Sequence, residues 1–196
     1  MTSFLLYIIF AYLIGGLCGA YYLLRWKIGE NLRDHGSGNL GATNAGRVLG
    51  KAGFIITFLW DAGKGSAIIY VARILDYDQP LIWICAIAVV AGHIWPIQLQ
   101  FKGGKGAATL IGILVVLDAY LLWPLLIIFL TSFVILRKFG IAGALAFFTL
   151  PFVVWLRGYE PLSVILSIIL TIIVIFAYRD HIVTFVSVFK KRSRNK

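Results

Sequence analysis

Long apolar segments alternate with short polar connections along almost the whole chain, a pattern that is typical of membrane-spanning helices. A helix that crosses the hydrocarbon core needs about 20 apolar residues. The candidate segments are residues 4–24, 53–75, 80–100, 107–117, 119–136, 139–156 and 161–178. The fourth segment would cover only about 16 Å, roughly half of the core. We therefore predict an all-α integral membrane protein with seven transmembrane helices, one of them half-length, in a single membrane domain over residues 1–196.

The composition agrees with this prediction, because 61% of the residues are hydrophobic and only 13% are charged. The mean hydropathy is +0.93, which excludes an ordinary soluble domain. The net charge of +10 then indicates cationic loops and affinity for anionic headgroups or a phosphorylated substrate, and not nucleic acid. Cys18 and Cys85 lie inside apolar runs without metal-ligand spacing, so neither a disulfide nor a metal site is expected.

Basic residues mark alternate connections of the predicted bundle, namely residues 25–51, 102–105 and 137–138 and the basic tail, residues 189–196. The other connections are acidic or neutral. Because Lys and Arg stay on the cytoplasmic side during insertion, the N-terminus is predicted to lie outside and the C-terminus in the cytoplasm, which requires an odd number of spans. The first segment lacks a basic start and continues for a full span, so no cleavable signal peptide is expected.

Two glycine-rich loops stand out from the apolar background: SGNLGATNAGR at residues 37–47 and FKGGKG at residues 101–106. Loops that combine glycine, small polar side chains and cations bind anions, above all phosphate. The predicted topology places both loops on the cytoplasmic face, where they could form one site. The second loop opens the half-length helix, so its free N–H groups would point into a protein cavity. A Walker A spacing is absent, which gives no support for nucleotide hydrolysis.

Several polar residues inside the spans allow two interpretations each. Asp61 and Lys64 share one helix face, and they form either a structural ion pair or part of a phosphate pocket. His93 is either a packing residue or a member of the site. Residues 178–181 are either a solvated helix end or a titratable cluster at the same interface. Residues 190–196 are expected to contact the membrane surface.

The motifs SGNLGATNAGR, DAGKG at residues 61–65, Gly92-His93 with Pro96, and FKGGKGAAT resemble the bacterial acyl-phosphate:glycerol-3-phosphate acyltransferase family in order and spacing. The resemblance extends from about Leu5 to about Ile182. It implies a seven-helix inner-membrane enzyme with its site at the cytoplasmic face. The implied reaction transfers a fatty acyl group from acyl phosphate to the 1-hydroxyl of glycerol 3-phosphate, giving lysophosphatidate and inorganic phosphate, the first step of phospholipid synthesis. Membrane lipids are further expected partners. No cofactor and no nucleic acid are expected, and a monomer is assumed.

The resemblance also implies roles for individual residues. Ser37, Arg47 and Lys105 are expected at the catalytic centre, where positioning and charge neutralisation suffice because acyl phosphate is already activated. The residues expected to bind substrate or phosphate are Gly38, Asn39, Gly41, Thr43, Asn44, Lys64, His93, Lys102, Gly103, Gly104 and Gly106. Lys102 could instead be only a topology signal.

Two motifs depart from the family pattern. After the fifth span the family usually has Arg, two residues and Ser, with a second Ser or small residue nearby, whereas this chain has Gly140 and Gly143. In the last span the pattern His-Arg-x-Asn-Ile reads Tyr178-Arg179-Asp180-His181-Ile182, and His181 is a candidate to take over a polar or proton-transfer role. Two alternatives therefore stay open, a carrier or channel for an anionic solute and an inactive paralogue that acts as a scaffold. The acidic outer connections argue against the carrier, because they would repel an anion.

Overall fold

The computed structural model describes residues 2–194, and it describes side chains as far as Ser187. The described residues form α-helices and short 3₁₀ turns, with no strand among them. This confirms the all-α prediction. The chain divides into two compact units, residues 1–119 and 120–196, which are described one at a time.

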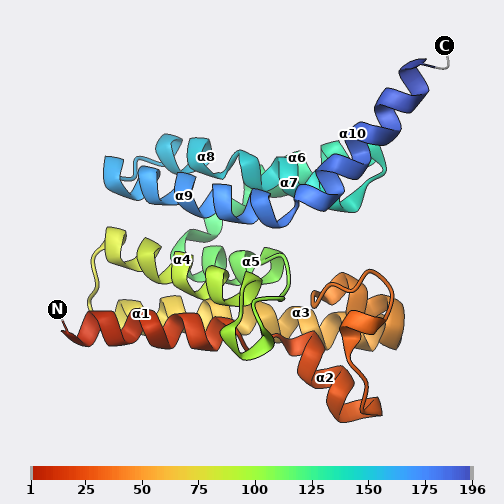
Figure 1. Ribbon diagram of the computed structural model, residues 1–196. Coiled ribbons are helices and arrows are strands. Elements are labelled where there is room, and N and C mark those ends of the chain that lie inside the picture. The colour runs from red at the N-terminus through yellow and green to blue at the C-terminus, as the bar shows by residue number, and fades with distance from the viewer. Residues whose placement is uncertain (1, 195–196) are drawn as a thin grey trace. The chain divides into compact units, whose positions relative to one another are not determined.

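The first unit contains helices α1 (Thr2–Gly15), α2 (Gly19–Ile28), α3 (Ala42–Ile74), α4 (Gln79–Ile94) and α5 (Ala107–Asp118), with 3₁₀ turns η1 (Leu32–Asp34) and η2 (Ile97–Leu99). As Figure 1 shows, α1 packs against α4, α3 packs against α5, and α2 lies against α3. Helix starts follow local chemistry, because the Asp78 carboxylate caps α4 by accepting a hydrogen bond from the Leu81 N–H, with Pro80 in the first turn.

Glycines allow these helices to approach closely. A Cβ atom at Gly15 would overlap the Val89 carbonyl of α4, and one at Gly92 would overlap the Tyr12 carbonyl of α1. Gly112 of α5 lies in the same way against the Ala62 carbonyl of α3. Small residues at such crossings let helix backbones touch, which is a common way to associate helices in a membrane.

Helix α3 is kinked at Gly50, where φ is 72° and ψ is −166°. This conformation is accessible to glycine and strained for other residues. It separates a short helical segment, residues 42–49, from a long one, residues 51–74, and brings Gly53 against Leu49 and Ala45. The long segment matches the predicted span at residues 53–75. The short segment, which carries Arg47, therefore belongs to the first glycine-rich loop and not to the span.

The second unit contains α6 (Leu122–Leu136), α7 (Phe139–Phe148), α8 (Leu150–Leu156), α9 (Pro161–Ala177) and α10 (Arg179–Arg194). Within this unit α7 packs against α6 and α9, α8 packs against α9, and α10 contacts α7 and α9 (Figure 1). Lys190, Lys191, Arg192 and Arg194 of the predicted basic tail belong to α10, but their side chains lie outside the described part, as do residues 195–196 entirely.

Within the described residues, four helices are long and apolar enough to cross a membrane, or up to six when each of two bent pairs counts as one span. The bent pairs are α1 with α2, at 45°, and α9 with α10, at 58°. Seven spans and the orientation of the termini are therefore not confirmed. The predicted and observed numbers of spans differ at Asp118, where one span was expected to end and the next to begin. The 3₁₀ turn η3 (Ala119–Leu121) instead joins α5 to α6, so Ala107–Leu136 is one helical run of 30 residues.

Candidate active site

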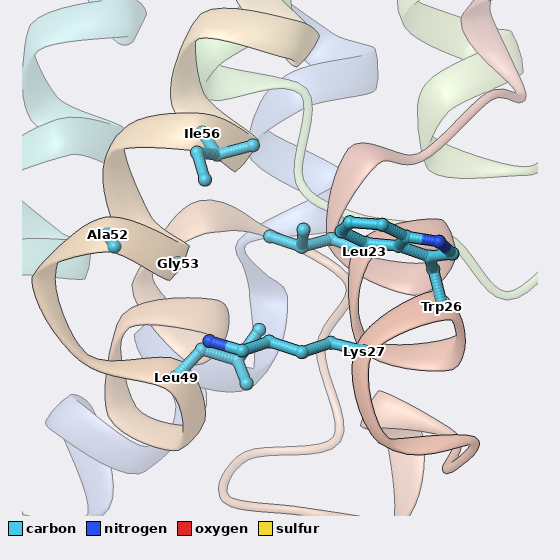
Figure 2. A pocket seen from close by; sticks show the side chains of 7 residues that line it. All are labelled: Leu23, Trp26, Lys27, Leu49, Ala52, Gly53 and Ile56. Atoms are coloured by element: carbon cyan, nitrogen blue, oxygen red, sulfur yellow. The ribbon is translucent and has the colours of Figure 1, made fainter.

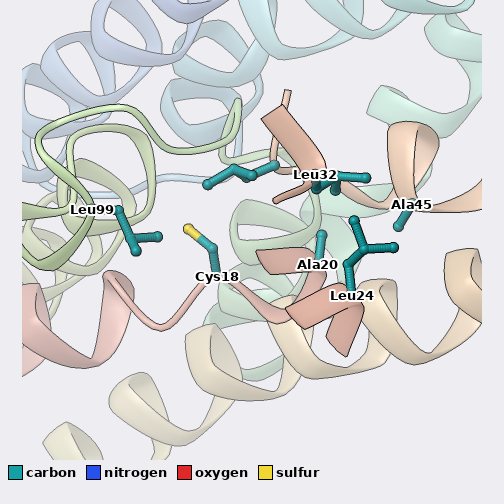
Figure 3. Close-up of a cluster of buried hydrophobic side chains, with 7 residues drawn as sticks. Cys18, Ala20, Leu24, Leu32, Ala45 and Leu99 are labelled. Atoms are coloured by element: carbon teal, nitrogen blue, oxygen red, sulfur yellow. The ribbon is translucent and has the colours of Figure 1, made fainter. Parts of the chain in front are cut away.

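A cluster of buried apolar side chains lies beneath the two glycine-rich loops. It draws on α2, the segment that contains η1, the first loop, and the turn before the second loop. Figure 3 shows most of its members, which are Cys18, Ala20, Leu24, Leu32, Leu40, Ala45 and Leu99. Segments far apart in the sequence thus share one core, which supports both loops in the first unit.

The first loop is shaped by the buried side chain of Asn44. Its Oδ1 accepts a hydrogen bond from the Ser37 N–H at 2.9 Å, and its Nδ2 donates to the carbonyl oxygens of His35 at 3.0 Å and Leu32 at 3.4 Å. The Asn44 side chain therefore links three backbone groups and stabilises the conformation of the loop. Ser37, Thr43 and Arg47 are exposed, whereas the other residues expected to bind substrate here are half-buried: Gly38, Asn39 and Gly41.

The second loop is fastened to the end of α4. The Gly104 N–H donates to the His93 carbonyl at 3.0 Å, and the Gly103 N–H donates to the Ile94 carbonyl at 3.0 Å. A Cβ atom at Gly104 would overlap Nε2 of the His93 ring, so only glycine fits there without movement. Gly106 has a φ of 78° and precedes α5, as the sequence predicted for a loop that opens a helix. Lys105 is half-buried and Lys102 is exposed.

Arg33, which precedes the first loop, connects it to the second. Its Nη2 donates hydrogen bonds to the carbonyl oxygens of Leu99 and Lys102, and its guanidinium lies 5.8 Å from the centre of the Tyr21 ring. No role for Arg33 followed from the sequence alone. A basic residue beside a glycine-rich loop was the only available signal, because its acceptors are backbone carbonyls.

Behind the second loop, Asp61, Lys64 and His93 form a buried polar network. Nζ of Lys64 lies 2.9 Å from Oδ1 of Asp61 and 2.9 Å from Nδ1 of His93. The same ammonium donates to the carbonyl oxygens of Gly15 at 2.8 Å and Leu17 at 3.1 Å. A lysine ammonium has three N–H donors, so these acceptors saturate it. The contacts favour the structural alternative for Lys64.

The network connects the bend between α1 and α2 to the second loop. Oδ1 of Asp61 accepts a hydrogen bond from the Gly19 N–H at 3.2 Å, at the start of α2. Lys64 donates a hydrogen bond to the Gly15 carbonyl at this bend. The His93 carbonyl accepts the hydrogen bond of the Gly104 N–H, and the His93 ring packs against Gly104. Among the described residues, no cluster of three or more His, Cys, Asp or Glu side chains is placed to hold a metal ion.

Comparison with known proteins identifies the family of the chain. The family model for glycerol-3-phosphate acyltransferase matches residues 5–187. The chain belongs to this family. It is 38% identical over 176 residues to glycerol-3-phosphate acyltransferase 1 of Bacillus anthracis, covering 90% of this chain and 92% of that one. It is 36% identical over 195 residues to the glycerol-3-phosphate acyltransferase of Endomicrobium trichonymphae, covering 98% of this chain and 94% of that one.

Solved structures support the same family assignment. A crystal structure of PlsY, an integral membrane glycerol 3-phosphate acyltransferase, in its glycerol 3-phosphate form has a TM-score of 0.87 at 29% identity and covers 94% of this chain and 92% of that one. The lysophosphatidic acid form of PlsY has a TM-score of 0.83 at 28% identity, with the same coverage. The predicted family, enzyme class and acyl transfer to glycerol 3-phosphate are confirmed, and the chain is a bacterial membrane acyltransferase.

The two motifs that depart from the pattern of the glycerol-3-phosphate acyltransferase family meet each other in the second unit. A Cβ atom at Gly140 of α7 would lie 2.9 Å from Nδ1 of His181, and one at Gly143 would lie 3.6 Å from the Tyr178 hydroxyl. Tyr178 is buried, whereas His181 is exposed. The loss of side chains on α7 thus accompanies larger side chains at the junction of α9 and α10. His181 belongs to this unit, and the other predicted catalytic residues belong to the first.

Proposed function

We propose that the two glycine-rich loops of the first unit form one phosphate-handling site for acyl transfer from acyl phosphate to glycerol 3-phosphate. The observation that carries this proposal is the pair of hydrogen bonds from Arg33 to the carbonyls of Leu99 and Lys102, because it ties the first loop to the second. Both loops also rest on one apolar core. Relatives named for glycerol 3-phosphate acyl transfer, and a PlsY structure in its glycerol 3-phosphate form, support the acceptor.

Arg47 and Lys105 are the cations of this site. Each reactant carries a phosphate group, so two cations on two adjoining loops match two anionic substrates. The Gly103-Gly104-Lys105-Gly106 backbone precedes α5, and the free N–H groups at the start of a helix add to the attraction for an anion. The exposed hydroxyls of Ser37 and Thr43 supply neutral hydrogen bonds that orient the substrates.

The reaction needs no covalent enzyme intermediate. The 1-hydroxyl oxygen of glycerol 3-phosphate attacks the carbonyl carbon of acyl phosphate and forms the ester bond. The bond between that carbon and the phosphate oxygen breaks, and the phosphate departs with the electron pair. The hydroxyl proton ends on the released phosphate, so the products are lysophosphatidate and inorganic phosphate. Lys105 and Arg47 stabilise the charge that grows on the leaving phosphate.

The site faces the cytoplasm in this proposal. Arg25, Lys27, Arg33, Lys51 and Lys102 surround the two loops in the sequence, and such basic connections stay on the cytoplasmic side during insertion. The networks of Asn44 and of Asp61, Lys64 and His93 hold the loops in place and do not bind substrate. This division of labour leaves the exposed residues of the loops to contact the reactants.

The donor is tested with the purified protein, glycerol 3-phosphate and three palmitoyl donors: palmitoyl phosphate, palmitoyl-CoA and palmitoyl acyl carrier protein. We expect lysophosphatidate and an equal amount of inorganic phosphate from palmitoyl phosphate alone. Product from either thioester and none from palmitoyl phosphate would overturn the donor. Absence of product from all three would favour the inactive scaffold.

A further inference from the structure

The last helix of the second unit separates apolar and polar residues onto two faces. In α10, Ile182, Phe185 and Val186 recur at the three- and four-residue spacing of one helix face. Thr184 and Ser187 lie on the opposite face by the same spacing. Their hydroxyls donate hydrogen bonds to backbone carbonyls of α10 itself, at 2.7 and 2.8 Å. These hydroxyls are therefore satisfied within the helix, and the apolar face is the one left to contact a partner.

Protein covers this apolar face only in part. Ile182 and Phe185 are half-buried, whereas 56% of Val186 is exposed. Val183, at the edge of the same face, is 67% exposed. Apolar side chains that protrude from the protein in this way gain free energy when another apolar surface removes them from water.

Helix α10 does not continue along the axis of α9, the last predicted span. The two helices are bent by 58° with respect to each other, as can be followed in Figure 1. The buried Tyr178 lies at the bend, and its ring packs against that of Phe147 in α7 with 6.5 Å between the ring centres. Packing therefore holds the bend, which turns α10 towards the plane of a membrane that α9 crosses.

The end of α10 and the residues after it are strongly basic in the sequence. The cations of this basic cluster are Lys190, Lys191, Arg192, Arg194 and Lys196, and no acidic residue follows Asp180. Clusters of about four to eight such residues on an amphipathic helix attract the anionic headgroups that give a cytoplasmic leaflet its negative surface potential. The match to the family model ends at residue 187, so the description of the family does not account for the cluster.

From these observations we propose that α10 is an interfacial helix that binds anionic phospholipid at the cytoplasmic surface of the membrane. Its apolar face inserts between headgroups and acyl chains, and the basic cluster lies among the lipid phosphates. An anionic membrane surface supplies both contacts at once, directly beside the end of the last predicted span. The inference goes beyond the proposed function and does not depend on the acyl donor.

Helix α2 offers a matched control, because it also combines apolar and basic residues but packs against protein. Leu24 is buried in the core beneath the loops. Figure 2 shows Leu23 and Lys27 in an open groove of about 470 Å³ beside Leu49 of α3. Arg25 and Lys27 thus carry the same charge as two members of the basic cluster, on a helix whose apolar side already has a partner.

The inference is tested with the full-length protein in nanodiscs of phosphatidylcholine, alone or mixed with phosphatidylglycerol. A nitroxide spin label is attached at Val186→Cys on the apolar face or at Ser187→Cys on the polar face. The native thiols of Cys18 and Cys85 are buried and stay unlabelled in the folded protein. Collisions with oxygen report lipid around the label, and collisions with a neutral, water-soluble nickel complex report water. We expect phosphatidylglycerol to move the label at residue 186 into lipid, while the label at residue 187 stays in water.

The basic cluster predicts the size of the effect. Each Lys or Arg near an anionic surface raises the ratio of bound to free helix about fivefold. Lys190→Gln combined with Lys191→Gln should therefore lower this ratio about 25-fold in the mixed nanodiscs. Arg25→Gln combined with Lys27→Gln removes the same charge from α2 and should leave the ratio unchanged. At about 1 M salt the Debye length falls to about 3 Å, so the effect of phosphatidylglycerol should disappear. The salt measurement keeps the basic cluster intact and decides the matter even where a charge variant unfolds.

Three results would contradict the inference. A label at residue 186 that stays in water in both lipid mixtures would show that the helix does not bind the membrane, and would favour an acidic soluble protein as its partner. Entry into lipid to the same extent with and without phosphatidylglycerol would show apolar contact without recognition of the anionic headgroup. Dipolar broadening between labels, in place of contact with lipid, would assign the apolar face to a second copy of the chain.

Discussion

The guanidinium group of Arg33 donates a hydrogen bond to the carbonyl oxygen of Lys102, 69 residues away along the chain. The same Nη2 atom also donates to the Leu99 carbonyl. A single side chain thus fixes the segment before the first glycine-rich loop to the segment that begins the second. Backbone carbonyls are the acceptors, so the geometry of the second loop depends on Arg33 whatever side chains the loop carries.

Arg33→Gln is expected to lower kcat/KM for glycerol 3-phosphate by about tenfold or more, because a hydrogen bond from a charged group contributes about 1.5 to 3 kcal/mol. Arg33→Lys should recover only part of the loss, since an ammonium cannot reproduce the planar geometry of the guanidinium. Arg25→Lys in α2 is the matched control. Wild-type kinetics in Arg33→Gln would mean that the two loops hold their positions without this connection.

Gly104→Ala tests the contact between the second loop and His93. The added Cβ atom would overlap Nε2 of the imidazole, and the ring cannot move away without breaking its hydrogen bond with Lys64. We expect turnover to fall by about a hundredfold, the loss that a displacement of about 1 Å produces in a positioned group.

Gly63→Ala is the control for Gly104→Ala, because a Cβ atom at Gly63 meets no atom within 4 Å. This variant should retain full activity, and its helix should be favoured by about 1 kcal/mol. Equal effects of the two substitutions would contradict the steric explanation.

The buried ion pair predicts a non-additive effect on stability. Lys64→Met leaves the Asp61 carboxylate, with 1% of its side chain exposed, without its cation. Removing one partner of a buried pair costs about 3 to 5 kcal/mol, whereas replacing both is much less costly. Thermal unfolding in detergent should therefore show a large loss for Lys64→Met and a smaller one for Asp61→Asn combined with Lys64→Met. If the double variant loses the sum of the two single losses, the pair does not act as a unit.

The altered motifs of the second unit predict a coupling between α7 and α10. Gly140→Ala would place a Cβ atom 2.9 Å from Nδ1 of His181, whereas Gly143→Ala would make an ordinary contact at 3.6 Å with the Tyr178 hydroxyl. We expect a decrease in activity for Gly140→Ala only. Combining it with His181→Asn, which restores the residue of the family pattern, should recover activity. A further decrease in the double variant would show that His181 is needed for another reason.

The helical fold was predictable because the lengths of the apolar segments carry the information. The kinks and bends that interrupt the helices were not predictable. Gly50 kinks α3, and a bend separates α1 from α2, yet a glycine within an apolar run hardly alters its hydropathy. Asp118 had the opposite effect, since a charge interrupts the apolar pattern while the backbone continues as a helix through η3. The half-length helix was predicted because the charge of Asp118 was taken to end the apolar segment that begins at residue 107.

The candidate site was predictable where composition carries the signal, in loops that combine glycines with cations. The hydrogen bonds that hold those loops in place were not predictable. Asn44 was expected to bind substrate, yet its amide hydrogen-bonds within its own loop. Lys64 allowed two interpretations, and its hydrogen bonds to the Gly15 carbonyl and to His93 favour the structural one. Arg33 was missed altogether, because contacts between a side chain and a distant backbone carbonyl leave no trace in the spacing of residues.

The most direct test of a shared phosphate site is the rate of lysophosphatidate formation from palmitoyl phosphate and glycerol 3-phosphate by Arg47→Ala and Lys105→Ala. Each rate is compared with that of Lys51→Ala, which removes an exposed cation just after the kink at Gly50. Removal of one group that stabilises developing charge lowers turnover by about a hundredfold to a thousandfold. We predict losses of at least this size for Arg47→Ala and Lys105→Ala and none for Lys51→Ala. Near-normal rates in both folded variants would contradict the account.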